Sequence, residues 1–151
     1  MLNRLKLAAA TVVTAAAVMV APAPAMAAVY DGVMASATPC ATGAYTARQK
    51  TLTTNTQLSE VIAKIELRYS PSCRTVWARI TSIKVTSDNL LGYVRRNSDW
   101  QGYECSEFGY SKNLGAQYCL TPMVNDAGVT SYALGGLKYN GVNYDGETAS
   151  F

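Results

Sequence analysis

The sequence predicts an all-β protein, a small antiparallel β-sandwich or barrel with two disulfides. Beyond residue 27 the chain is rich in Thr, Ser and Tyr, and all 11 glycines lie there. Apolar stripes with the period of a long helix are missing. Short runs of β-forming residues are instead bounded by turn residues, which is typical of antiparallel sheets. All four cysteines lie in the same part of the chain.

The first 27 residues predict a secretory signal peptide. Arg4 and Lys6 precede an uncharged apolar run from Leu7 to Val20, and Ala25-Met26-Ala27 offers the small residues that signal peptidase requires. A retained membrane anchor is the disfavoured alternative, because the run is shorter than the ~20 residues that a spanning helix needs. We therefore expect residues 28–151 to form one secreted, extracellular domain with no membrane span once the signal is removed.

The charge of the expected domain is nearly balanced. It carries 11 basic and 10 acidic residues, because two of the 13 basic residues belong to the predicted leader. Nucleic acid binding needs clustered Lys and Arg that neutralise several phosphates, so no nucleic acid partner is expected. The adjacent pair Arg95-Arg96 is interpreted as a solvated strand end.

Four cysteines in an exported chain predict two disulfide bonds. Three pairings are possible, and the sequence alone does not choose between them. We favour Cys105 with Cys119, which would close a local hairpin, and Cys40 with Cys73, which would tie the N-terminal segment to the rest. A zinc site competes with this interpretation, but there is no C-x-x-C spacing and no histidine. Neither a metal nor a cofactor is expected.

Seven strands are expected, and short turn motifs separate them. The segment 44–58 could hold a short helix. Gly135-Gly136, Asn140-Gly141 and Asp145-Gly146 are expected in turns. The expected strands are residues 60–69, 74–83, 90–97, 101–108, 116–124, 129–135 and 147–151.

The stretch from Val61 to Ile83 is predicted to form a hairpin with one apolar face. Odd positions are apolar in the first strand and even positions in the second. A turn at Pro71-Ser72 would place Leu67 opposite Val76 and Glu66 opposite Trp77. Both apolar sets then share one face, whereas a slip of one residue would separate them.

The reverse face of this hairpin is the candidate binding face: Glu66, Arg68, Trp77 and Arg79. An indole ring among guanidinium groups and a carboxylate would suit a sugar ring or an acidic loop of a partner protein. The alternative is that the N-terminal segment covers this face. Cys73 points to the same side as Trp77, so a bond to Cys40 would draw residues 40–50 across it.

The residue types limit the available chemistry. Without histidine, the Ser-His-Asp and Cys-His arrangements cannot be built, and oxidised cysteines provide no thiolate. A carboxylate pair remains. Asp99, Glu104 and Glu107 are the nearest cluster, but Glu104 and Glu107 would face opposite sides of a regular strand. No catalytic residue is therefore assigned.

The mature part of the chain resembles the YjfA family, small secreted proteins of streptomycetes and bacilli that form a domain of unknown function. The resemblance implies secretion and a compact domain with disulfides, and it supplies no catalytic residue. It also implies a domain type that occurs as the outward-facing part of some membrane-tethered regulators. Residues 53–58 look longer than the family pattern. The motifs that carry the resemblance are Val29-Tyr30-Asp31-Gly32, Cys40, Ala44-Tyr45-Thr46-Ala47, Ile65-Glu66-Leu67-Arg68-Tyr69-Ser70, Cys73-Arg74, Trp77-Ala78-Arg79, Arg96-Asn97, Cys105, Tyr118-Cys119-Leu120-Thr121-Pro122-Met123, Asp126 and Ser131-Tyr132-Ala133.

We therefore expect a secreted, non-enzymatic binding domain whose partner is a cell-wall glycan or another extracellular protein. A secreted inhibitor that presents the loop closed between Cys105 and Cys119 is the first alternative. A hydrolase built on Glu66 or Glu104 is the less favoured one.

Overall fold

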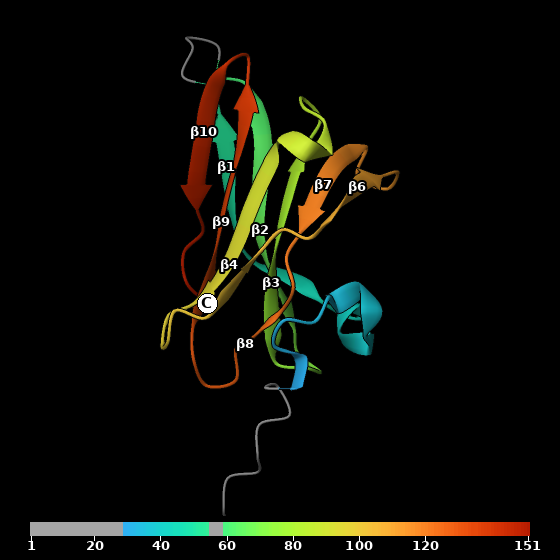
Figure 1. Ribbon diagram of the computed structural model, residues 1–151, viewed down its shortest axis with the longest axis vertical. Coiled ribbons are helices and arrows are strands. Elements are labelled where there is room, and N and C mark those ends of the chain that lie inside the picture. Colours follow the sequence, from blue (N-terminus) through green and yellow to red (C-terminus); the bar gives the residue numbers. More distant parts are fainter. Residues whose placement is uncertain (1–28, 55–58) are drawn as a thin grey trace, which may run out of the picture.

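The protein is a sandwich of two antiparallel sheets, as the sequence predicts (Figure 1). The computed structural model describes residues 29–54 and 59–151, so the predicted leader lies outside the described residues. One sheet has the order β1-β2-β3-β7-β6, with β8 beside β3, and the other has the order β10-β9-β4-β5. The strands are β1 (Tyr45–Thr53), β2 (Val61–Ser70), β3 (Thr75–Ser82), β4 (Leu90–Arg96), β5 (Gly102–Glu104), β6 (Glu107–Ser111), β7 (Ala116–Leu120), β8 (Val124–Asn125), β9 (Ser131–Tyr139) and β10 (Val142–Glu147).

The core lies between the inner faces of the two sheets. In β2 and β3 the predicted alternation holds, because Ile65 and Leu67 point into the same core as Val76 and Ile80. Burial of such side chains stabilises the fold by roughly 1.5–3 kcal/mol each. The sandwich architecture therefore follows from strands that are apolar on one side.

The β2–β3 hairpin corrects the predicted register by two residues. Leu67 pairs with Ala78 and Glu66 with Arg79, so Glu66 is not opposite Trp77. The turn takes four residues instead of two, and its last residue, Arg74, has a φ of 53°. Because the shift is an even number of residues, the apolar sets still share one face.

Four further expectations about local structure are wrong. Most of the segment 44–58, expected as a short helix, forms strand β1 (Tyr45–Thr53), and its part 55–58 lies outside the described residues. Gly135-Gly136, expected in a turn, lies inside β9. Glycine is needed at residue 135 because a Cβ there would lie only 2.6 Å from Cγ1 of Ile80. Asp145-Gly146 lies inside β10. The expected strand at 147–151 is limited to Glu147, although Ser131 and Phe151 exchange two backbone hydrogen bonds.

The chain crosses from one sheet to the other between β5 and β6. The amide of Cys105 donates to the carbonyl of Gly92 in β4 (2.9 Å), and the amide of Ser106 donates to that of Leu120 in β7 (2.9 Å). Residues 101–108, expected as one strand, are therefore shared between the sheets. Both favoured disulfides are present, Cys105–Cys119 at this crossing and Cys40–Cys73 at the β2–β3 turn.

Candidate functional site

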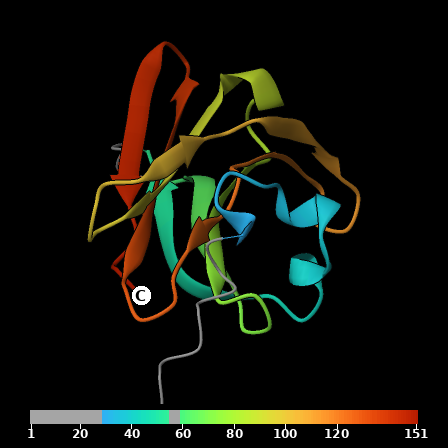
Figure 2. The same ribbon diagram turned by 60° about the horizontal axis from the view of Figure 1, so that its bottom comes forward.

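The predicted binding face lies on the outside of the six-stranded sheet, and the N-terminal segment covers its Trp77. Two 3-10 turns, Ala35–Ala37 and Pro39–Ala41, lie at the end of β3, where Figure 2 shows the segment in blue to cyan. Trp77 is 6% exposed and packs with Ala35, Cys40 and Met123. A cover is therefore present and the indole ring is not at the surface, but residues 35–41 make it, whereas residues 45–50 of the expected cover lie in β1 beside β2.

The charged residues around Trp77 bind one another. Glu66 accepts hydrogen bonds from Arg79 Nε (2.7 Å) and from Thr46 Oγ1 (2.7 Å). Arg68 donates to Thr46 Oγ1 (2.7 Å) and to the carbonyl of Ala44 (2.7 Å). Burial alone would raise the pKa of Glu66, but the hydrogen bonds from Arg79 and Thr46 outweigh it and hold that pKa below its ordinary value. These contacts fasten β1 and the N-terminal segment to the sheet.

The opposite side of the sandwich, the outer face of β10, β9, β4 and β5, carries an open surface that we call the four-strand face. The register places its outward side chains in rows across the sheet. Apolar side chains occupy the middle of these rows, and carboxylates occupy both margins. One row is Glu147, Leu134, Tyr93 and Glu104; the next is Asp145, Gly136 and Leu91; the row at the other end holds Tyr132 and Arg95.

An aromatic and arginine cluster forms one end of the four-strand face. The guanidinium of Arg95 lies 4.9 Å from the ring centre of Trp100 and 5.7 Å from that of Tyr93. Its Nε is buried and has no hydrogen-bond partner among the described residues. The prediction that the pair Arg95-Arg96 is solvated is wrong for Arg96, which is buried and forms ion pairs with Asp31 (3.0 Å) and Asp99 (2.6 Å).

Trp100 is held outward by the loop between β4 and β5. Its side chain is 61% exposed, and its φ of 62° is in the left-handed region, which is uncommon for a non-glycine residue. Its amide donates to the carbonyl of Arg96 (3.1 Å), and Asn97 anchors the loop through hydrogen bonds to Thr130 (2.8 Å) and Ser150 (3.0 Å). Backbone strain of this kind persists where the surroundings enforce it and is common at functional sites.

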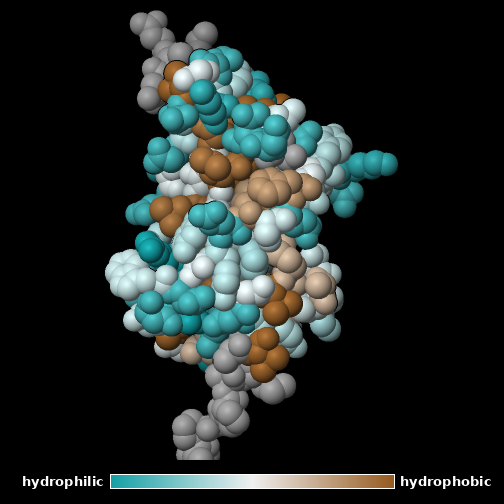
Figure 3. All heavy atoms as spheres, in the orientation of Figure 1, coloured by the Kyte–Doolittle hydropathy of each residue, from teal (hydrophilic) through white to brown (hydrophobic). Residues whose placement is uncertain are grey.

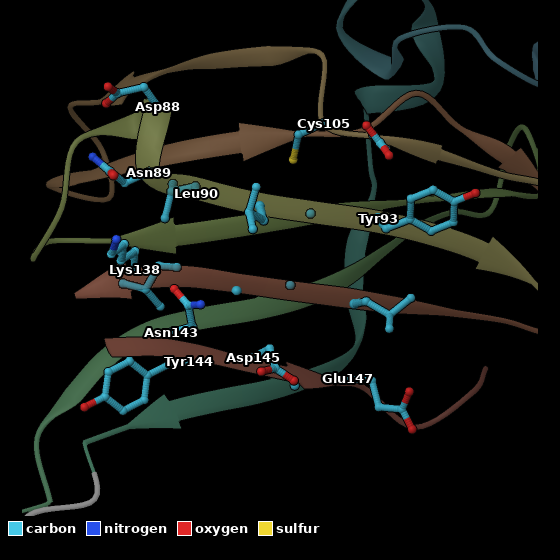
Figure 4. A pocket seen from close by; sticks show the side chains of 18 of the residues that line it. Asp88, Asn89, Leu90, Tyr93, Cys105, Lys138, Asn143, Tyr144, Asp145 and Glu147 are labelled. Carbon is cyan, nitrogen blue, oxygen red and sulfur yellow. The ribbon is translucent and has the colours of Figure 1, made fainter. Parts of the chain in front are cut away.

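A shallow groove of about 920 Å³ runs from β10 across β9 and β4 toward Phe108 in β6. Gly136 lines the floor of this groove. A Cβ at this position would lie 2.7 Å from the carbonyl oxygen of Tyr144, so the floor is closely packed there. Figure 4 shows Tyr93 of β4 together with Asp145 and Glu147 of β10 along the groove. In Figure 3, hydrophobic side chains gather over the upper part of β4 between hydrophilic ones.

The groove has an unbalanced charge. Four of the ten acidic residues line it, namely Asp88, Glu104, Asp145 and Glu147, and none of them forms an ion pair within the described residues. Lys138 is the single basic residue among the described residues that line the groove. Its surface is therefore acidic with an apolar centre.

The three carboxylates of the predicted cluster have different surroundings. Asp99 is bound by Arg96, which lowers the pKa of Asp99 to about 2. Glu107 accepts hydrogen bonds from Ser36 (2.7 Å) and Tyr118 (3.4 Å), and Glu104 lines the groove. In the part of the chain that the structure describes, no three His, Cys, Asp or Glu side chains gather as metal ligands, and no helix is long and apolar enough to cross a membrane.

Sequence reasoning missed the four-strand face, although a signal was present. Residues 90–95 alternate like the strand at 61–69, so Leu91, Tyr93 and Arg95 share one side. What the sequence could not give was which of the two tryptophans is covered. That depends on where the N-terminal segment lies.

Fold and surface together define a disulfide-bonded β-sandwich with a covered tryptophan on one outer face and an exposed tryptophan beside the other. The chain belongs to the family described as protein of unknown function (DUF2690), whose model matches residues 28–134. It is 36% identical over 137 residues to the uncharacterized protein YjfA of Bacillus subtilis (strain 168), a match that covers 84% of this chain and 82% of that protein. No solved structure matches significantly. The family predicted from the motifs is confirmed.

Proposed function

We propose that the protein is a secreted, non-enzymatic binding domain that uses the four-strand face to hold an extracellular ligand, a cell-wall glycan or another protein. The observation that carries the proposal is Trp100, a large aromatic side chain 61% exposed on a strained backbone. Aromatic residues and arginine are the residue types most enriched at binding hot spots. The neighbouring groove supplies the concave surface that a ligand needs.

The mode of export supports the same proposal. The two disulfides are typical of proteins in oxidising compartments. The leader predicted at residues 1–27, with cleavage after Ala27, would deliver the domain to such a compartment.

The test compares two exposed aromatic residues. Trp100→Gly removes the indole and suits the positive φ at this position, so the variant should stay folded. We expect it to lose retention on insoluble peptidoglycan or chitin, or binding to extracted envelope proteins, whichever the native protein shows. Tyr110→Ser in β6, outside the groove, should behave like the native protein. If the native protein is retained by none of these materials, the proposal is wrong.

A second candidate, the secreted inhibitor, is favoured by the β6–β7 hairpin. The Cys105–Cys119 bond closes this hairpin, which exposes Tyr110 and Leu114. A rigid loop lowers the entropy cost of binding to an enzyme. Loss of binding in Tyr110→Ser but not in Trp100→Gly would favour this candidate over the four-strand face.

A further inference from the structure

We propose that the ligand of the four-strand face is an extended basic segment of a partner protein, with a cationic side chain at every second position. This inference rests on the proposed function, because it names the ligand class of the same surface. It follows from the charge, the spacing and the apolar centre of the groove.

The charge argument comes from the unpaired carboxylates. The groove is lined by four carboxylates, those of Asp88, Glu104, Asp145 and Glu147. Lys138 is the one basic residue among the described residues that line it. Like charges gathered on one surface repel one another, and a cationic ligand relieves the repulsion while the groove raises its local concentration. A polyanionic glycan would be repelled, and a neutral glycan would gain nothing from these charges. The charge therefore favours a basic protein segment.

The spacing argument comes from the strands. Asp145 and Glu147 are two residues apart in β10 and lie on the same side of the sheet, about 6.8 Å from each other along the strand. An extended peptide repeats its side chains at the same interval. Lysines at alternate positions of a segment parallel to β10 would therefore meet both carboxylates in turn.

The middle of the groove completes the fit. Leu91, 70% exposed, together with Leu134 and Tyr93, separates the acidic margins of β10 and β5. Glu104 lies three strands from Glu147, which is about 14 Å at the usual strand spacing. A single extended segment fills the width between the two acidic margins when the alkyl parts of its lysine side chains lie over these apolar side chains. Arg95 closes the far end of the acidic surface.

The experiment uses an eight-residue peptide of alternating Lys and Thr, blocked at both ends and labelled for fluorescence anisotropy. One control peptide has the same composition with its lysines in one block, and the other has Glu in place of Lys. The mature native protein should bind the alternating peptide at low salt, and its affinity for this peptide should fall as the salt concentration rises. Its affinity should exceed that for the block peptide at least threefold, and the Glu peptide should not bind.

The variants test the surface itself. Combined Glu104→Gln, Asp145→Asn and Glu147→Gln should weaken binding at least tenfold, while Glu60→Gln, an exposed acidic residue outside the groove, should not. Circular dichroism and the thermal midpoint should confirm that all variants are folded. Unchanged affinity in the triple variant, or equal affinity for both Lys peptides, would overturn the inference.

Two other outcomes separate this inference from the proposed function. Glycan retention that depends on Trp100 but not on the three carboxylates would keep the binding domain and overturn the basic ligand. Self-association in sedimentation that the triple variant abolishes would make a second copy of this chain the occupant. That result would also overturn the inference.

Discussion

The two tryptophans lie on opposite outer faces of the sandwich, and their surroundings differ in every respect. Trp77 is covered by a segment that a disulfide ties down, and the arginines beside it have acceptors. Trp100 is open, and the arginine beside it has a buried Nε without a partner among the described residues. The same pair of residue types therefore stabilises the fold on one face and leaves binding capacity on the other.

The largest expected difference between the two faces is in the response to loss of the indole. Trp77→Ala should lower the free energy of unfolding by about 3–5 kcal/mol, because it leaves a cavity under the N-terminal segment. Trp100→Ala should change it by less than ~1 kcal/mol, because the ring is exposed. Urea denaturation of both variants measures this. Equal losses would remove the distinction between a structural and a binding tryptophan.

The next largest effect concerns the cover itself. Replacing Cys40 and Cys73 with Ala removes a bond between residues 33 apart, which should cost about 2–4 kcal/mol. Acrylamide should then quench a larger share of the tryptophan fluorescence, because the segment over Trp77 opens more often. An unchanged quenching curve would mean that packing alone holds the cover.

A matched pair of substitutions compares one carboxylate from each face. Glu66→Gln should cost about 2–3 kcal/mol, because Glu66 is buried and accepts charged hydrogen bonds from Arg79. Glu104→Gln, on the open face, should change the free energy of unfolding by less than ~0.5 kcal/mol. Thermal or urea unfolding of the two variants side by side checks this. A large loss in Glu104→Gln would show that Glu104 has a structural role.

Two buried carboxyl groups, those of Glu66 and Asp126, should respond oppositely to pH. Glu66 has a lowered pKa in the folded state, so its stabilising effect is present above its ordinary pKa and is lost as pH falls. Burial raises the pKa of Asp126, near Arg96, from 3.8 to about 6, so folding is favoured below pH 4 and this contribution disappears as pH rises through 6. Asp126→Asn should remove a decline of about 2–3 kcal/mol between pH 4 and 7. Urea midpoints across that range measure it, and an identical decline in the variant would contradict it.

The smallest effect should have the opposite sign. Trp100→Gly relieves a φ of 62°, so the free energy of unfolding should stay level or rise by less than ~1 kcal/mol. The thermal midpoint of the variant measures this. A clear loss would mean that the indole contributes to the fold, and Trp100 would then carry no argument for binding.

Strand alternation predicted the sandwich and the apolar face of the β2–β3 hairpin, and the even cysteine count predicted two disulfides, which form in the favoured pairing. Strand alternation did not predict the register of this hairpin. The motif Pro71-Ser72 suggested a two-residue turn, whereas the turn has four residues and ends at Arg74, whose φ is positive. Gly135 and Gly136 were taken for a turn because the sequence does not show that Ile80 packs against one of them and the β10 backbone lies over the other. The sequence also did not show which of the two tryptophans is covered, so the candidate binding face was assigned to the side that carries Trp77. Burial of Trp77 depends on a segment over thirty residues away along the chain.

The crossing at Cys105 has a consequence for how the sandwich can move. The two sheets are joined by hydrogen bonds and a disulfide along the side of β5 and β6, whereas no strand ladder joins β1 to β10 among the described residues. Breathing motions of the domain should therefore separate the sheets on the β1 side and pivot about the β5–β6 side. The groove near Phe108 and Tyr93 lies beside the pivot, where the walls keep their separation while the opposite margin fluctuates.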